Sequence, residues 1–244
     1  MKHLPALYIG KYDGLKVREL ALSNNAKSTL ILEGTTQQSE ANNIYGILPG
    51  KSEETILISS HHDSAFQGAS EDGTGVASVL AQARAWSKIP KEKRPRTLLF
   101  LLTAGHLYAG IGAEIFAKKH RNGFLKNTLI DVNLEHLCAK EVEEDPMTHN
   151  YRETGNQALG VVFLSKNIPI IAHTMKAFKE NNIERMVLVP DNFFATPPIG
   201  EAGDLMTFAP HLNVISLIRA PYYLLNSEDT LDKIKMDKLV PIAQ

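Results

Sequence analysis

Short apolar runs alternate with helix-like segments along most of this chain, and this alternation limits the possible fold more than any other feature. Apolar residues recur with a helical period in residues 75–87, 112–120 and 168–181. Around these segments lie runs rich in leucine and β-branched residues, at 29–32, 43–48, 55–60, 97–103, 129–134, 160–164, 186–189 and 213–218. Strands that alternate with helices of this length predict a mostly parallel sheet covered by helices on both faces.

The composition agrees with one large α/β domain and excludes several kinds of protein. The 244 residues are 43% hydrophobic and 22% charged, which is ordinary for a globular chain that buries a full core. The net charge of -1 gives no electrostatic indication of nucleic-acid or membrane-surface binding. The single Cys138 excludes an internal disulfide and a paired-cysteine zinc motif.

The sequence also predicts a soluble protein without a membrane span. No run approaches the roughly 20 apolar residues that cross a bilayer. Pro5 and Gly10 interrupt the N-terminal segment too early for a signal peptide. Residues 140–156 are acidic and then polar, and we expect them to form a long loop. Residues 1–20 lack an obvious partner in the chain, so we expect the tail of another domain there and a single domain over 21–244.

Imidazole and carboxylate side chains follow three of the predicted strands. The carboxyl ends of parallel strands meet at one edge of a sheet, so these side chains are expected to lie together. They are His61, His62, Asp63, His106, Glu135 and His136, with Glu71 and Asp72 at the start of the helix that follows the first strand. Histidine and carboxylate are the ligand types that bind zinc. Glu201 and Asp204, in a glycine-rich segment, are further candidates for contact with this edge.

Each of these residues also has an ordinary structural interpretation. Asp72 alone could be a helix N-cap, and a single histidine after a strand is usually a hydrogen-bonded rim residue. The coincidence of several such residues on one edge favours a metal site. Other catalytic sites are not indicated: the sequence contains no Gly-x-Ser-x-Gly motif, and the glycine-rich run 68–75 carries two carboxylates and no lysine, which would repel phosphate.

A family resemblance rests on several of these motifs together. They are His61-His-Asp-Ser64, Glu71 ten residues after His61, Gly73-Thr-Gly75, and Asn43-Ile-Tyr-Gly-Ile-Leu-Pro-Gly50 upstream. From about residue 40 onward the chain resembles the zinc exopeptidases with two co-catalytic metals, which include bacterial leucyl aminopeptidases, aminopeptidase Y and glutamate carboxypeptidase. The resemblance implies an α/β three-layer sandwich, with a mixed, mostly parallel sheet of about eight strands between helices. Residues 4–20 resemble the end of the protease-associated domain that some members carry.

The resemblance implies a reduced metal site. The positions of the family's first metal hold His61, Glu71 and Glu135, and Asp63 takes the place of the residue that orients the histidine. At the second metal only His106 remains as a ligand, because Leu225 stands where the family has a late histidine. Gly105 stands at the position of the general base. We therefore predict one zinc ion held by His61, Glu71 and Glu135, with His106 or His136 as a fourth ligand.

Two functions follow as hypotheses. The first is a metal-dependent exopeptidase, similar to an aminopeptidase, that acts on peptide or amide bonds with an altered, one-metal centre. The second is a catalytically silent relative whose fold serves binding or assembly, which the changes at Gly105 and Leu225 favour. Without a positioned carboxylate base, a rate factor of roughly 10²–10⁴ should be missing. The resemblance also implies that relatives are often exported, and the sequence indicates no oligomeric state.

Overall fold

The computed structural model describes residues 6–23, 25–35, 37–193 and 197–243, which form two compact units, Met1–Glu40 and Ala41–Gln244. In the first unit, helix α1 spans Lys11–Ala21 and buries none of its residues. The predicted domain tail, 1–20, begins in residues 1–5, which lie outside the described residues; that domain boundary stays a prediction. The predicted strand at 29–32 is wrong: these residues have no regular structure, and Leu30, Ile31 and Leu32 are exposed.

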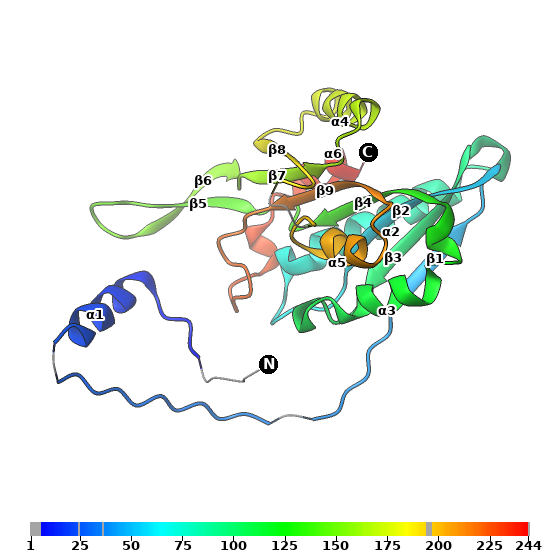
Figure 1. The fold of residues 1–244 in the computed structure, drawn as a ribbon. Coiled ribbons are helices and arrows are strands. Elements are labelled where there is room, and N and C mark those ends of the chain that lie inside the picture. The colour runs from blue at the N-terminus through cyan, green and yellow to red at the C-terminus, as the bar shows by residue number, and fades with distance from the viewer. Residues whose placement is uncertain (1–5, 24, 36, 194–196, 244) are drawn as a thin grey trace. The chain divides into compact units, whose positions relative to one another are not determined.

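The second unit is built on a mixed sheet of seven strands among the described residues (Figure 1). In spatial order the strands are β1 Ile44–Leu48, β3 Arg96–Thr103, β2 Ser52–His61, β4 Thr128–Glu135, β9 Asn213–Arg219, β7 Gly160–Leu164 and β8 Met186–Pro190. The β1–β3 and β7–β9 pairs are antiparallel. The β2–β3, β2–β4, β4–β9 and β7–β8 pairs are parallel. The predicted mixed, mostly parallel sheet is confirmed, with one strand fewer because 29–32 does not join it.

Helices cover both faces of this sheet, which confirms the predicted three-layer architecture (Figure 1). On one face, α2 (Thr74–Ser87), α4 (Ile168–Glu180) and α6 (Leu239–Ala243) pack around a core that includes Ile58 and Phe100. On the other, α3 (Ile111–His120) and α5 (Glu201–Phe208) pack on Leu57 and Leu101. Alternate residues of β2 and β3 thus enter opposite cores, as the pleat requires. Residues 57–61 of β2 and 98–103 of β3 are therefore all buried, which explains the continuous apolar runs.

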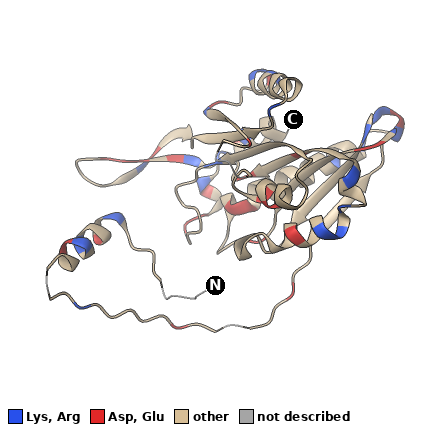
Figure 2. Ribbon diagram, viewed as in Figure 1, with Lys and Arg blue, Asp and Glu red and all other residues tan. Residues whose placement is uncertain are grey.

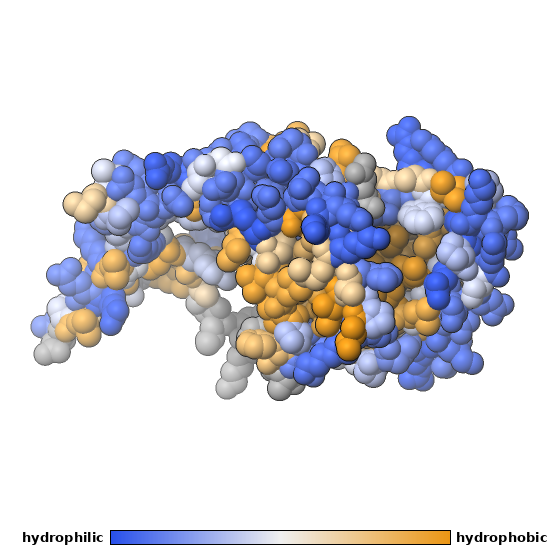
Figure 3. Space-filling view, turned by 90° about the horizontal axis from the view of Figure 1, so that it is seen from above, coloured by the Kyte–Doolittle hydropathy of each residue, from blue (hydrophilic) through white to orange (hydrophobic). Residues whose placement is uncertain are grey.

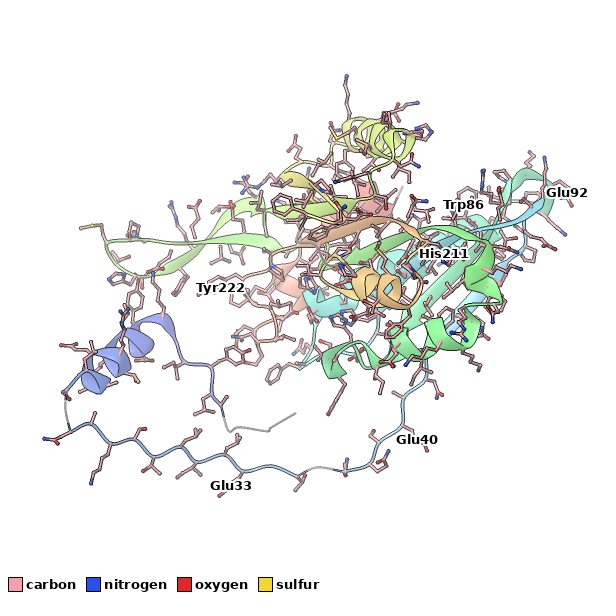
Figure 4. All side chains as sticks on the ribbon, viewed as in Figure 1. Glu33, Glu40, Trp86, Glu92, His211 and Tyr222 are labelled. Atoms are coloured by element: carbon pink, nitrogen blue, oxygen red, sulfur yellow. The ribbon has the colours of Figure 1, made fainter. Side chains whose placement is uncertain are left out.

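A two-stranded sheet replaces the loop predicted at 140–156. Strands β5, Lys140–Glu144, and β6, Tyr151–Gln157, pair as a hairpin. Its turn is closed by Asp145, whose Oδ1 accepts hydrogen bonds from the backbone N–H groups of Met147 and Thr148 at 2.8 and 3.1 Å. On the segment after β9, the Tyr222 ring lies 5.0 Å from that of Tyr151 (Figure 4). Both strands of the hairpin are rich in charged and polar residues, so the sequence shows no alternation of apolar and polar residues that would predict them.

Short turns of helix complete the second unit. They are the π-helical turn η1, Ala69–Gly73, and the 3-10 turns η2 Lys91–Lys93, η3 His106–Tyr108, η4 Phe124–Asn127, η5 Leu231–Lys233 and η6 Met236–Lys238. Turn η1 follows β2 and turn η3 follows β3, so both lie near the carboxyl ends of these strands. Two of these turns, η1 and η3, carry residues of the predicted metal site.

The face shown in Figure 3 is largely hydrophilic, with an apolar area near its middle. Ile44, Tyr45 and Leu80 are also exposed, and they help to line a cavity of about 300 Å³ between the edge strand β1 and helix α2. Within the described residues, none of the helices has both the length and the apolar character that crossing a membrane requires.

Candidate metal centre

Three neighbouring parallel strands end together and present polar side chains at one edge of the sheet. β3, β2 and β4 are adjacent, and His61 and Thr103, the last residues of β2 and β3, are in register. Glu135 ends β4. After β2 the chain enters η1, which brings Glu71 to within 3.6 Å of His61, measured from Oε1 to Nε2. The ends of β2, β3 and β4, together with η1, thus bring polar side chains from four segments to one edge of the sheet.

Among the described residues, the group of potential ligands whose members are all buried is His61, Glu71 and His136. One ligand atom from each lies within 4.8 Å of the others, and all three residues are buried. His136 Nε2 forms a close ion pair with Glu71 Oε2. Apart from this contact, Glu71 Oε2 and His136 Nε2 have no hydrogen-bond partner among the described residues, and His61 Nε2 has none. Buried polar atoms almost always have a hydrogen-bond partner, so the lack of one at His61 Nε2 requires a physical explanation.

The backbone fixes the tautomer of both imidazoles. His61 Nδ1 lies 2.9 Å from the main-chain oxygen of Asp63, and His136 Nδ1 lies 3.3 Å from that of Arg219. Because a carbonyl oxygen only accepts, each Nδ1 must donate, which leaves Nε2 free of a proton when the ring is neutral. Asp63 therefore orients His61 through its main-chain oxygen. Its carboxylate instead accepts from the backbone N–H groups of His106 and Leu107 at 3.1 and 3.2 Å.

Glu71 is held in place by a residue from the other end of the chain. The two carboxylate oxygens of Asp229 accept hydrogen bonds from the backbone N–H groups of Ser70 and Glu71, at 2.9 and 3.0 Å. Sequence reasoning assigned Asp229 no role, because its partners are main-chain atoms that leave no pattern in the sequence. The contact fixes η1 against the segment that precedes η5.

Asp72 combines the expected capping role with a second contact. Its Oδ1 accepts from the backbone N–H of Gly75, at 3.3 Å, at the start of α2, and from that of His136, at 2.8 Å. Ser60 donates to its other oxygen. Burial raises the pKa of the Asp72 carboxyl well above its ordinary value. Asp72 therefore links the start of α2 to the residue that follows β4.

The predicted ligand set is divided between two groups. His61 also lies with His106 and Glu135, whose ligand atoms fall within 4.8 Å of one another. The His61 and His106 rings stack, with centroids 4.1 Å apart. Glu135 Oε1 accepts from the backbone N–H of Glu201 at 2.7 Å, and burial raises the pKa of the Glu135 carboxyl to about 7. No group among the described residues contains both Glu71 and Glu135.

A third group is formed by His106, Glu201 and Asp204. Glu201 and Asp204 lie in the first turn of α5, a helix on which Figure 2 marks acidic residues and no Lys or Arg. His106 Nδ1 lies 3.0 Å from Glu201 Oε2 and 3.7 Å from Asp204 Oδ2. Burial acts to lower the pKa of His106, but the bond to Glu201 and the surrounding carboxylates raise it to about 9. In the sequence, only the glycine-rich segment around Glu201 and Asp204 indicated that these two residues contact the site.

Gly105, which the resemblance predicts to stand at the family's general-base position, has a backbone that disfavours a side chain. Its φ of +74° is left-handed, and a Cβ built there would lie 2.6 Å from Ile111 Cγ2. The turn that carries His106 therefore depends on glycine, and glutamate does not fit there without rearrangement. Leu225, in place of the late histidine, is also left-handed, with φ 55°, and its side chain is largely exposed.

The first group has the chemistry and spacing of a zinc site. Zinc binds imidazole nitrogen and carboxylate oxygen at about 2.0–2.2 Å, which in tetrahedral geometry separates the ligand atoms by about 3.3–3.6 Å. The 3.6 Å between His61 Nε2 and Glu71 Oε1 agrees with this spacing. A cation would also satisfy His61 Nε2, which is buried without a hydrogen-bond partner, and would be shared by the Glu71 and His136 atoms that contact each other. The residues present therefore fit zinc.

Comparison with solved structures identifies the same architecture in several aminopeptidases. The aminopeptidase of Aneurinibacillus sp. strain AM-1 is 21% identical, with a TM-score of 0.58 over 82% of this chain and 45% of that chain. The zinc aminopeptidase BSAP of Bacillus subtilis is 16% identical, with a TM-score of 0.62 over 82% and 47%. LapA aminopeptidase of Legionella pneumophila is 14% identical, with a TM-score of 0.61 over 82% and 50%. This chain thus covers about half the length of these proteins, and the likeness shows a shared fold.

Sequence comparison assigns the family. Among curated proteins, none matches the chain significantly. The model of peptidase family M28 matches residues 43–186, which include β1 to β4, η1 and all three residues of the fully buried ligand group. Because this match covers more than half of the chain, the protein belongs to peptidase family M28.

Proposed function

We propose that this protein is a zinc-dependent exopeptidase, similar to an aminopeptidase, whose catalytic zinc is held by His61, Glu71 and His136. The observation that carries the proposal is the convergence of three buried ligand residues, in which His61 Nε2 has no hydrogen-bond partner and Glu71 Oε2 and His136 Nε2 contact only each other. This ligand set keeps His61 and Glu71 from the sequence prediction and takes His136, predicted only as a fourth ligand, in place of Glu135. Family membership and the zinc aminopeptidases of the same fold support the choice of metal and reaction.

In this proposal the protein supplies ligands, orientation and a proton acceptor. Zinc, when bound, acts as a Lewis acid that polarises a carbonyl oxygen and acidifies water. The main-chain oxygens of Asp63 and Arg219 hold the two imidazoles in the tautomer that presents Nε2. Asp229 fixes the backbone that carries Glu71. Three protein ligands leave one coordination position for water or the substrate.

Glu135 is the carboxylate we assign to proton transfer. Gly105 has no group that can accept a proton. Glu135 is not a member of the His61–Glu71–His136 group, yet its carboxylate lies within 4.8 Å of a ring nitrogen of His61. The start of α5 orients it through the backbone N–H of Glu201. It therefore lies close to the proposed zinc ligands without being one of them.

Hydrolysis of aminoacyl p-nitroanilides, measured together with zinc content, tests the proposal. We expect turnover and bound zinc in the wild-type protein, and loss of both in His61→Ala. His62→Ala is the matched control, because His62 is the neighbouring histidine and its Nε2 contacts the main-chain oxygen of Asn42 at 2.9 Å, outside the ligand group. Equal activity and zinc content in the two variants would contradict the proposal.

A catalytically silent relative is the second candidate, and Gly105 is the observation that favours it. The left-handed backbone at Gly105 favours glycine there, which supports a chain without the general base that the family resemblance predicts at this position. On this reading the protein is folded and His61 still binds zinc, but no aminoacyl or peptidyl substrate is hydrolysed. Zinc content dependent on His61, combined with absence of turnover, would identify this second function.

A further inference from the structure

We propose that Arg219 is a positioning residue for the proposed zinc centre, because its buried side chain fixes the main-chain oxygen that orients His136. Arg219 is the last residue of β9. The inference rests on the proposed function, since it takes His136 to be a zinc ligand. Its test measures the geometry of the bound metal and requires no substrate.

The guanidinium of Arg219 is buried and bonds to neutral oxygens. The residue is 2% exposed. Nη1 donates to the main-chain oxygen of Ala158 at 2.5 Å, and Nη2 donates to Gln157 Oε1 at 3.1 Å and to the main-chain oxygen of Glu184 at 3.0 Å. Among the described residues, no carboxylate forms an ion pair with Arg219. A buried charge is unfavourable unless hydrogen bonds compensate it, so these acceptors must stay in place around the guanidinium.

The acceptors of Arg219 come from two places in the chain. Gln157 ends β6 and Ala158 follows it, whereas Glu184 precedes β8. In the sheet, β7 lies between β9 and β8 (Figure 1). Gly160, which pairs with Arg219 across β7 and β9, leaves room for the side chain: a Cβ there would lie 3.0 Å from Arg219 Cγ. Arg219 therefore reaches across β7 and fastens the end of β9 to both segments.

The main-chain oxygen of Arg219 lies at the metal site. It is 3.3 Å from His136 Nδ1, and this contact leaves Nε2 of the neutral ring free for zinc. The pairing of β4 with β9 ends at Glu135 and Ile218, one residue before His136 and Arg219. That pairing therefore does not hold the oxygen directly, and its position depends on the pairing with β7 and on the guanidinium.

The alternative is a purely structural role for Arg219. The guanidinium would then stabilise the junction of β6, β8 and β9. His136 would keep its orientation without it, through the bond from its backbone N–H to Asp72 Oδ1 at 2.8 Å. Both roles predict a less stable protein when Arg219 is replaced, but only the positioning role predicts a changed metal centre.

Substitution of zinc by cobalt(II) distinguishes the two roles, because the visible absorption of cobalt depends on its ligands and their geometry. Arg219→Met keeps an unbranched apolar side chain and removes every donor. We expect it to alter the cobalt spectrum and to weaken zinc binding by about 10–100-fold, as is typical when a residue that orients a metal ligand is lost. Arg219→Lys, which keeps the charge and some donors, should restore part of the affinity. Absorption spectroscopy and chelator competition measure the two effects.

Arg94→Met is the matched control. Arg94 is also buried, at 8% exposed, and its guanidinium also donates to main-chain oxygens, those of Pro49 and Ile89. These acceptors lie outside the metal site. Arg94→Met should lower the free energy of unfolding, measured in urea, as Arg219→Met does. It should leave the cobalt spectrum and the zinc affinity at their wild-type values.

Gln157→Met is a second, milder variant, which carries the test if Arg219→Met does not fold. It removes one acceptor of the guanidinium and leaves Arg219 itself in place. We expect it to shift the cobalt spectrum in the same direction as Arg219→Met, to a smaller extent. Circular dichroism checks that each variant is folded.

Each other outcome has a distinct meaning. A wild-type spectrum and zinc affinity in folded Arg219→Met, or in Gln157→Met where Arg219→Met is unfolded, would overturn the positioning role and leave the proposed zinc site intact. Equal spectral changes in Arg94→Met and Arg219→Met would also overturn it, because the change would then follow from lost stability. A cobalt spectrum that is unchanged in His136→Ala, or a wild-type protein that binds no metal, would overturn the proposed ligand set and the inference with it.

Discussion

At the scale of single residues, the neighbours Glu135 and His136 contact different parts of the site. Glu135 is the last residue of β4, and His136 follows it with a left-handed backbone, φ 50°. This change of direction lets His136 meet Glu71 while Glu135 meets the start of α5. Local sequence carries no signal of a left-handed histidine. The sequence could therefore predict the cluster, but not whether Glu135 or His136 joins His61 and Glu71 in the fully buried group.

We expect Glu135→Gln to separate catalysis from metal binding. If Glu135 accepts the proton, kcat should fall by roughly 10²–10⁴, because the amide cannot take up a proton. Zinc content should stay at the wild-type value, since the proposed ligands are unchanged. The measurement is steady-state hydrolysis with elemental analysis of the same sample. A variant that loses zinc and activity together would indicate that Glu135 is a ligand instead.

Asp131 should make stability depend on pH. Burial raises the pKa of its carboxyl from the ordinary 3.8 to about 7, although Ser59 donates a hydrogen bond to it at 2.7 Å. Between these two values the folded state keeps a proton that the unfolded state releases. The contribution of Asp131 to the free energy of unfolding is therefore full below about pH 4, falls as the pH rises, and is lost above about pH 7.

Asp131→Asn tests this dependence, because its amide keeps the acceptor for Ser59 and cannot ionise. The variant should be more stable than the wild type at pH 8, by on the order of 2–4 kcal/mol, and the difference should shrink toward pH 4. Urea unfolding at several pH values measures it. Glu143→Gln, at an exposed position on β5, is the control. A constant difference across this range would show that Asp131 does not titrate there.

At the scale of elements, the sequence predicted the helices and strands that bury an apolar face, because these produce hydrophobic periodicity. Seven of the eight proposed strand segments and all three proposed helices are present, because their buried faces impose a visible pattern. The hairpin β5–β6 was missed since its two strands are mostly polar or partly exposed. The segment at 29–32 has the composition of a strand, but a strand also needs a hydrogen-bonded neighbour, which composition does not supply.

The turn η1 depends on a contact that spans the sequence. Asp229 is buried and accepts from two backbone N–H groups of η1. Asp229→Ala should weaken zinc binding by about 10–100-fold, because Glu71 loses its fixed backbone. It should also lower the free energy of unfolding by about 1–3 kcal/mol. Chelator competition and urea unfolding measure the two effects. Asp232→Ala, whose side chain is 66% exposed on the same segment, should change neither; equal effects in both variants would refute the assignment.

At the scale of the whole molecule, metal and fold should be thermodynamically coupled. The metal-free protein buries the carboxylates of Glu71 and Glu135 and the unpartnered Nε2 of His61, and in our proposal zinc binds only the folded arrangement. At free zinc about 1,000 times Kd, the gain in stability is about 4 kcal/mol. For a chain of this size this corresponds to a rise in Tm of roughly 8–16 °C. Calorimetry with and without a chelator measures it, with His61→Ala as the variant in which zinc should have no effect. An unchanged wild-type Tm would contradict a specific site.

The order in which the ligands and their supports occur along the chain has a consequence for biosynthesis. His61, Glu71 and His136 all lie in the first part of the second unit, whereas the Arg219 oxygen and the Asp229 carboxylate that position them come from β9 and beyond. A nascent chain on the ribosome that ends after β4 would possess every donor atom but no rigid arrangement of them. Cofactor loading in the cell should therefore follow translation of residue 229, and translation intermediates stalled before it should fail to retain the ion.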